Sequence, residues 1–304
     1  MATESFSPQT AASTGLGSEQ RVRRRLLRMF RTPKGLIGLS LVVLFSLTAI
    51  LSPLFIQEAL STKINVTARL APPSPSHPLG TDQLGRELSY RVLLGARTSL
   101  MVAVLAVALS IVLGLPLGVL SGYFKGWTDL SLMRLVDTLL SFPVLLLALS
   151  ISAILGPSVR NATVAIGIAF APYLSRIVRS ETLKVSSLPY IEAARAQGAS
   201  DLRIITRAIL PNILAPVMVQ ATISVAFAIL AEAGLSFLGL GTQPPTPSWG
   251  LMIQASRDYL DVAPWTALVP GTAVALSVLG LNMLGDVLRD VLDPTFIFES
   301  AGAQ

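Results

Sequence analysis

Long apolar stretches constrain this chain more strongly than any single motif does. They lie at residues 35–56, 99–123, 135–155, 162–177, 213–240 and 264–288. A helix rises 1.5 Å per residue, so about 20 residues cross the roughly 30 Å hydrocarbon core of a bilayer. The composition agrees, because 52% of the residues are hydrophobic and 13% are charged, whereas soluble proteins have about 25% charged residues. We predict an all-α polytopic membrane protein with six transmembrane helices, and we exclude a soluble domain.

The lysine and arginine residues are distributed unevenly along the chain, with a dense cluster before the first apolar stretch. Because such residues favour the cytoplasmic side of a membrane, we expect cytoplasmic N- and C-termini. The cluster itself predicts a basic amphipathic helix on the membrane surface. A cleaved signal is disfavoured, because its apolar core would be only about 7–15 residues long. The predicted division is a cytoplasmic basic tail (1–34), a first transmembrane helix (35–56), an extracytoplasmic segment (57–98), a core of five helices (99–290) with an inward loop (178–211), and a cytoplasmic tail (291–304).

Several kinds of chemistry are excluded by what the sequence lacks. The chain has no cysteine and a single histidine, His77, so disulfides and cysteine-based zinc sites are absent. It contains no phosphate-binding loop of the G-x-x-x-x-G-K-[ST] type. We therefore expect no catalytic residue, no bound cofactor and no metal, and we read the net charge of +6 as membrane orientation rather than nucleic-acid binding.

The inward loop 178–211 carries the strongest local pattern. Ser186 or Ser187 can cap a short helix that has Pro189 in its first turn and Gly198 just past its end. A second helix is predicted from Asp201 to Leu210, where Pro211 meets it. This unit is too polar to enter lipid, and its small residues allow another surface to approach closely: Ala193, Ala194, Gly198 and Ala199.

The same loop resembles the EAA loop of bacterial ABC importer permeases, through Glu192-Ala193-Ala194, Gly198 and the run 209–212. Further segments are similar to the DppC/OppC group: 77–82, 85–87, 95–100, 122–129, 232–241 and 285–290. The resemblance covers about residues 75–294 and the first apolar stretch. Three residues depart from the common pattern, namely Ala208, Glu87 and Thr295.

The resemblance implies a type I ABC importer permease with the MetI-like fold, located in the cell membrane. Such a subunit moves dipeptides, oligopeptides or a related small solute into the cytoplasm. Its implied partners are a related second permease, two cytoplasmic ATPases that hold ATP and Mg²⁺, and an extracytoplasmic solute-binding protein. The resemblance also implies that the inward loop couples this chain to an ATPase. The coupling residues would be Tyr190, Glu192, Ala193, Ala194, Gly198, Ala199, Leu210 and Pro211. The competing hypothesis is a secondary transporter driven by an ion gradient.

Two groups of charged residues leave their roles open. Glu232 lies within an apolar stretch, where an ionisable side chain must face protein or water. It either lines the translocation path or forms an interhelical hydrogen bond, and the second interpretation is favoured. Asp286, Arg289 and Asp290 share one helix face. They form either a gate or ATPase contact or a solvated, self-paired helix end, and the last interpretation is favoured.

Overall fold

A computed structural model describes residues 32–55 and 58–292 of the chain. The predicted basic surface helix before the first apolar stretch and nearly all of the C-terminal tail lie outside these residues. The described part is built from helices, apart from two isolated β-bridges in the segment before the second long helix. The elements are α2 (Pro33–Phe55), α3 (Glu58–Thr62), η1 (Val66–Ala68), α4 (Leu88–Phe124), α5 (Gly126–Leu140), α6 (Val144–Leu155), α7 (Val159–Ser186), α8 (Pro189–Ala196), α9 (Asp201–Ile204), η2 (Ile205–Ile209), α10 (Leu210–Phe237), α11 (Trp249–Ser256), η3 (Arg257–Tyr259) and α12 (Trp265–Leu292).

Five helical segments in the described part are long and apolar enough to cross a bilayer. They are Pro33–Phe55, Leu88–Phe124, Val159–Ser186, Asp201–Phe237 and Trp265–Asp290. The predicted third span is instead two helices, α5 and α6, which meet at an angle of 86°. The break lies at Pro143, which lacks a backbone N–H and pushes the preceding residue out of helical geometry. The expected number of six is reached when this bent pair counts as one span.

The helices that correspond to the second and fourth predicted spans are longer than the apolar stretches in the sequence. The second helix begins at Leu88 rather than at Ser99, and the fourth runs from Val159 to Ser186 rather than over 162–177. In both cases the additional turns include a charged residue that has a partner in the fold, Arg91 in α4 and Arg179 in α7. Arg91 of α4, for example, lies 3.5 Å from Asp82 and is only 4% exposed. A helix boundary placed at the first charged residue therefore makes the predicted helix too short.

The helix that follows the inward loop does not end at Pro211. The chain runs from α9 through the π-helical turn η2 directly into α10, which carries Pro211 in its first turn. In the π turn the N–H of Leu210 bonds to the carbonyl of Ile205, five residues back. Such a turn widens the helix just where the proline ring would meet a carbonyl oxygen. The separate short helix predicted from Asp201 to Leu210 is therefore wrong.

The α4–α7 pair forms the most extensive helix contact in the structure. It depends on glycines spaced four residues apart at positions 114, 118 and 122 of α4. A Cβ atom added to Gly118 would lie 2.5 Å from the carbonyl oxygen of Ser175 and 2.6 Å from Cβ of Val178. The missing side chains thus allow the two backbones to touch, as small residues do in membrane helix pairs.

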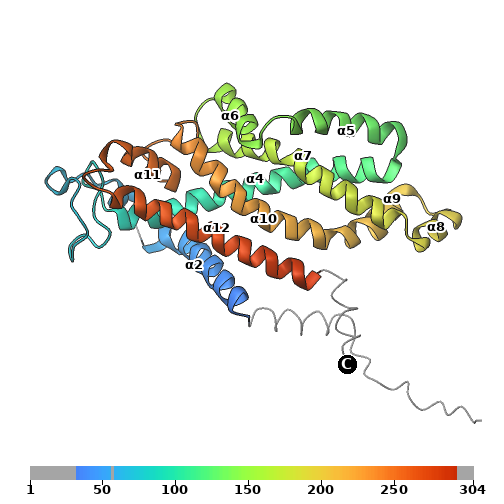
Figure 1. Cartoon of the computed structure of the whole chain (residues 1–304), viewed down its shortest axis with the longest axis horizontal. Coiled ribbons are helices and arrows are strands. Elements are labelled where there is room, and N and C mark those ends of the chain that lie inside the picture. The colour runs from blue at the N-terminus through green and yellow to red at the C-terminus, as the bar shows by residue number, and fades with distance from the viewer. Residues whose placement is uncertain (1–31, 56–57, 293–304) are drawn as a thin grey trace, which may run out of the picture.

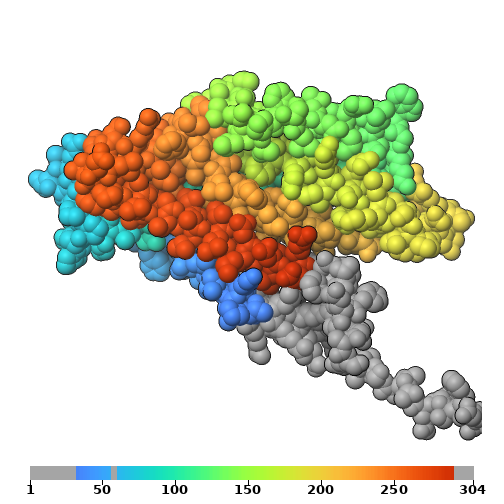
Figure 2. Space-filling model, viewed as in Figure 1, coloured from blue at the N-terminus to red at the C-terminus, as the bar shows by residue number. Residues whose placement is uncertain are grey.

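The described part of the molecule is elongated, and its two ends differ (Figure 1). At one end, α8 projects beyond the long helices. At the other end lie α11 and the segment 63–87. The space-filling view shows the same arrangement, with the cyan segment and yellow α8 at opposite ends (Figure 2). The start of α2 lies against the end of α12, because a Cβ atom added to Gly38 would be 2.8 Å from Cβ of Met283.

Candidate functional site

Helix α8 has the bounds that its local sequence predicts, although its start is capped differently. Pro189 occupies the first turn, where a missing N–H costs no hydrogen bond. Leu188, not a serine, is the residue before the helix, and Ser187 instead donates to the carbonyl of Lys184 at the end of α7. Gly198 has φ +80 and follows the end of α8. It thereby closes the helix with bonds from the N–H of Gly198 to Arg195 and from the N–H of Ala199 to Ala194.

Two apolar side chains, Ile191 and Ala194, pack α8 against the helical bundle. Ile191 is fully buried in a cluster that includes Val119 of α4, Val178 of α7 and Ile213 of α10. The residues around it face outward, among them Tyr190, which is 47% exposed, and Glu192 and Ala193. The helix is therefore an attached projection whose outer face is largely exposed.

A polar joint connects α8 and α9 to the end of α4. The hydroxyl of Tyr123 donates to Asp201 Oδ1 over 2.6 Å. The guanidinium of Arg195 lies 4.9 Å from the centre of the Tyr123 ring, in the range of cation–π contacts. Tyr123 is 4% exposed. The sequence offered no signal for this joint, because its members are separated along the chain and only the fold brings them together.

The remaining predicted coupling residues lie at the base of this projection. Gly198 is exposed, Ala199 and Leu210 are half-buried, and Pro211 is exposed. Asn212 donates to the hydroxyl of Tyr190 over 3.3 Å and to the carbonyl of Ala208 over 2.6 Å. The loop and the start of α10 thus form one continuous unit.

Glu232 of α10 is 1% exposed and lies in an interhelical hydrogen-bond network. Its oxygens accept from Ser99 of α4 over 2.8 Å, from Ser236 over 2.7 Å and from Thr242 over 3.3 Å. Ser99 in turn accepts from the backbone N–H of Trp249 in α11. The carboxyl group therefore links α4, α10 and the loop that follows α10, as a role in interhelical hydrogen bonding requires.

We expect substitutions of Glu232 to lower stability in a graded order. Glu232→Ala leaves several buried hydroxyl groups without an acceptor, and each such group costs about 1–3 kcal/mol. Glu232→Gln keeps one acceptor oxygen and should lie between the wild type and the alanine variant. Thermal unfolding of the detergent-solubilised chain measures this order. Equal melting temperatures for all three proteins would exclude a structural role.

Charged residues of α5 pair with α7 rather than with each other. Arg179 donates to both oxygens of Asp129, over 2.6 and 2.5 Å, and Ser121 of α4 donates to the same carboxylate. Arg176 donates to Asp137 over 2.5 Å. Asp137 thus pairs with a neighbouring helix and not with Arg134, which lies three residues before it in α5.

The end of the molecule opposite α8 holds a second polar cluster. Asp82 accepts from the side chain and the backbone N–H of Arg86, and it lies near Arg91. His77 Nδ1 and Glu87 Oε1 form a hydrogen bond, so the glutamate that departs from the common pattern has a partner here. These contacts hold the segment before α4 in one conformation.

Asp286, Arg289 and Asp290 are all exposed near the end of α12. Within the part of the chain that the structure describes, no ion pair joins them. The predicted self-pairing is absent among these residues, because side chains in solvent gain little from holding one geometry. Their role as a gate or partner contact stays a prediction.

Residues 114–297 match the family model described as binding-protein-dependent transport system inner membrane component. The chain belongs to this family. The match includes α8, Glu232 and the end of α12, and it establishes a multi-pass protein of the cell membrane. The resemblance drawn from the sequence motifs is thereby confirmed.

Curated relatives of this permease cover most of its length. It is 44% identical over 272 residues to the dipeptide transport system permease protein DppC of Alkalihalophilus pseudofirmus, which covers 90% of this chain and 89% of the relative. It is 46% identical to the di/tripeptide transport system permease protein DppC of Pseudomonas aeruginosa, with 71% of each chain covered. It is 44% identical to the glutathione transport system permease protein GsiD of Pectobacterium atrosepticum, over 73% of this chain and 74% of the relative.

The fold is also found in a solved transporter. A chain from an inward-facing structure of the MetNI methionine ABC transporter superposes with a TM-score of 0.56 at 21% identity. The superposition covers 66% of the permease and 96% of that chain. The MetI-like fold predicted from the motifs is therefore confirmed.

Proposed function

We propose that this permease is the membrane-spanning subunit of an ATP-driven importer for dipeptides, oligopeptides or a related small solute such as glutathione. The names of the curated relatives support this substrate class. The proposal places both chain termini and α8 in the cytoplasm. The adjacent ends of α2 and α12 are consistent with termini on one side.

The observation that carries the proposal is the exposed, anchored helix α8. We assign it as the surface that docks on an ATPase subunit, with Tyr190, Glu192, Ala193, Ala194, Gly198 and Ala199 at or beside the contact and Leu210 and Pro211 at its base. Ile191 and the Tyr123 joint link α8 rigidly to α4, α7 and α10. A displacement of α8 by the ATPases would therefore move the spans rather than bend the loop.

The proposed complex contains further chains. ATP and Mg²⁺ belong to two ATPase subunits, so this chain supplies no hydrolytic residue. A related second permease completes the translocation path, and an extracytoplasmic solute-binding protein delivers the solute at the α11 end. The family description supports the binding protein and the transport role, while the second permease and the stoichiometry rest on this proposal.

The gradient-driven alternative relies on Glu232 as a proton or cation relay. In the structure both Glu232 oxygens accept hydroxyl hydrogen bonds from within the chain. A relay must exchange protons or cations with water, and this arrangement does not favour it. Uptake that requires ATP and persists when the membrane potential and proton gradient are dissipated is therefore expected.

The absence of cysteine makes the docking and orientation directly measurable. We expect Ala193→Cys to react with an impermeant maleimide only after cells are permeabilised, and to cross-link to the ATPase subunit. Ser76→Cys, at the opposite end, is the matched control and should react in intact cells without cross-linking. Labelling of Ala193→Cys in intact cells would overturn the orientation, and absence of its cross-link in a functional complex would overturn the docking role.

A further inference from the structure

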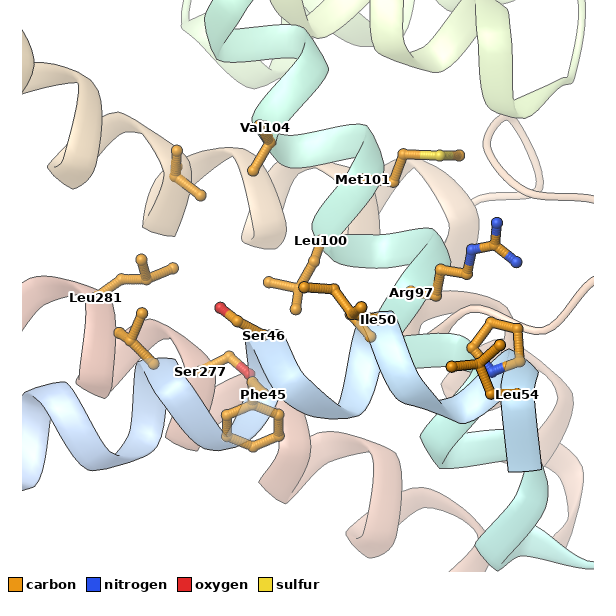
Figure 3. Close-up of a pocket in the computed structure, with 14 residues that line it drawn as sticks. Phe45, Ser46, Ile50, Leu54, Arg97, Leu100, Met101, Val104, Ser277 and Leu281 are labelled. Carbon is orange, nitrogen blue, oxygen red and sulfur yellow. The ribbon is translucent and has the colours of Figure 1, made fainter. Parts of the chain in front are cut away.

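An apolar groove of about 630 Å³ runs between α2, α4 and α12 (Figure 3). This volume lies within the roughly 300–1,000 Å³ typical of small-ligand sites. Apolar side chains from these helices form most of its wall, including Phe45, Ile50, Leu54, Leu100, Met101 and Leu281. Helix α2 is largely exposed, because only 17% of its most apolar 18-residue stretch is buried. The groove is therefore accessible to bilayer lipid.

Arg97 lies at one end of this groove (Figure 3). It is the one charged side chain among the described residues that line it. Arg97 is exposed, and no ion pair or hydrogen bond joins it to the described part of the chain. An arginine side chain is always charged, and beside apolar surface it needs an anion or water.

A second, smaller recess of about 190 Å³ adjoins the groove and shares Arg97 and Met101 with it. Its polar walls are Thr98 and Thr246, whose hydroxyl groups can donate hydrogen bonds. An apolar groove and a recess that carries two hydroxyl groups thus meet at the Arg97 guanidinium. This arrangement matches an amphiphile that has an anionic head and a long apolar tail.

The position of Arg97 along α4 matches the depth of a lipid headgroup. No charged residue follows it until Lys125, so it marks the end of the apolar part of the helix. Basic side chains at such a level interact with anionic lipid headgroups. A peptide carboxylate would offer the same charge, but the groove runs alongside α2, the least buried of the five long apolar helices.

We propose that this groove is a binding site for an anionic phospholipid. The phosphate contacts Arg97 in the recess with Thr98 and Thr246, and one acyl chain lies in the groove against α2 and α4. The lipid would fill the space between the first helix and the rest of the bundle.

Trp249 offers a built-in probe for the acyl chain. Its ring lies edge-on to Phe45, a groove residue, with 5.7 Å between the ring centres. The full-length chain with Trp127→Phe and Trp265→Phe retains Trp249 as its one fluorophore of this type. Reconstituted in vesicles, it should be quenched by phospholipids that carry bromine on the acyl chain.

We expect brominated phosphatidylglycerol to quench Trp249 at about fivefold lower mole fraction than brominated phosphatidylcholine, the effect of one basic side chain near an anionic headgroup. Arg97→Gln should remove this preference. Arg160→Gln, an exposed arginine at the start of α7, is the matched control and should keep it. Ala49→Phe, which fills the groove, should reduce quenching by both lipids.

Four results would overturn the proposal. They are equal quenching by the two lipids in the wild type, a preference that survives Arg97→Gln, a dipeptide that abolishes quenching, and loss of quenching when a second permease is co-reconstituted. The dipeptide result would assign the site to the transported solute. The last result would make the groove a subunit interface.

Discussion

Replacing Glu192 with lysine is expected to abolish ATP-driven solute uptake while the permease still inserts and folds. Glu192 is exposed on α8, so the folded chain loses no buried contact. It lies in the first turn, where a negative charge favours the helix by about 0.3–1 kcal/mol, and this loss is small. The larger effect is the reversed charge in the middle of the proposed ATPase contact, beside the small residues that permit close approach.

Uptake in proteoliposomes that contain the assembled transporter measures this effect. We expect a decrease of at least about tenfold, which corresponds to about 1.4 kcal/mol of lost interaction. Asp258→Lys makes the same charge change at the opposite end of the molecule, on the exposed residue Asp258 of η3, and should leave the co-purification of the ATPase subunits unchanged, whereas Glu192→Lys should lower it. Wild-type uptake by Glu192→Lys would remove α8 from the coupling mechanism.

Replacing Gly118 with alanine is expected to produce the largest loss of stability among single substitutions of glycine in the long helices. The added Cβ would approach the Ser175 carbonyl oxygen and the Val178 side chain far inside van der Waals contact. Because a backbone atom cannot move aside, α4 and α7 must separate. Overpacking of this kind costs about 1–3 kcal/mol, and a larger side chain such as leucine should prevent folding.

Gly271 of α12 provides the matched control for this experiment. It is also a helical glycine, but a Cβ atom placed there meets nothing within 4 Å. Gly271→Ala should be neutral or stabilising by up to about 1 kcal/mol, because alanine favours the helix. Thermal unfolding in detergent compares the two variants, and equal melting temperatures would show that the α4–α7 contact does not depend on Gly118.

Local signals in the sequence were sufficient for α8. A proline in the first turn and a glycine just past the end define its bounds, and both act within a few residues of the helix. The glycines that α4 presents to α7, at positions 114, 118 and 122, also follow a four-residue spacing that can be read from the sequence. In each case the physical cause lies in neighbouring positions, so no knowledge of the fold is needed.

Helix boundaries and charge pairing could not be predicted in the same way. Arg91 extends α4 because Asp82 and the carbonyl of Ser61 surround it, and Asp137 pairs with Arg176 across two helices. Pro143 breaks a helix, whereas Pro211 lies inside one because a π turn precedes it. Each outcome depends on tertiary contacts or on backbone adjustment that sequence spacing does not reveal.

The role of Glu232 illustrates the same limit. An ionisable residue within an apolar stretch calls for a partner, but the sequence does not identify it. The partners are hydroxyl groups from Ser99, Ser236 and Thr242, which arrive from α4, from the next turn of α10 and from the loop that follows.

Uptake of a labelled dipeptide into proteoliposomes tests the central claim most directly, with the permease reconstituted either alone or together with its second permease, ATPases and binding protein. We expect no uptake by the permease alone, under ATP or under an imposed ion gradient, and ATP-dependent uptake by the complete assembly. Gradient-driven or ATP-driven uptake by the isolated chain would contradict a permease that is moved by separate ATPase subunits.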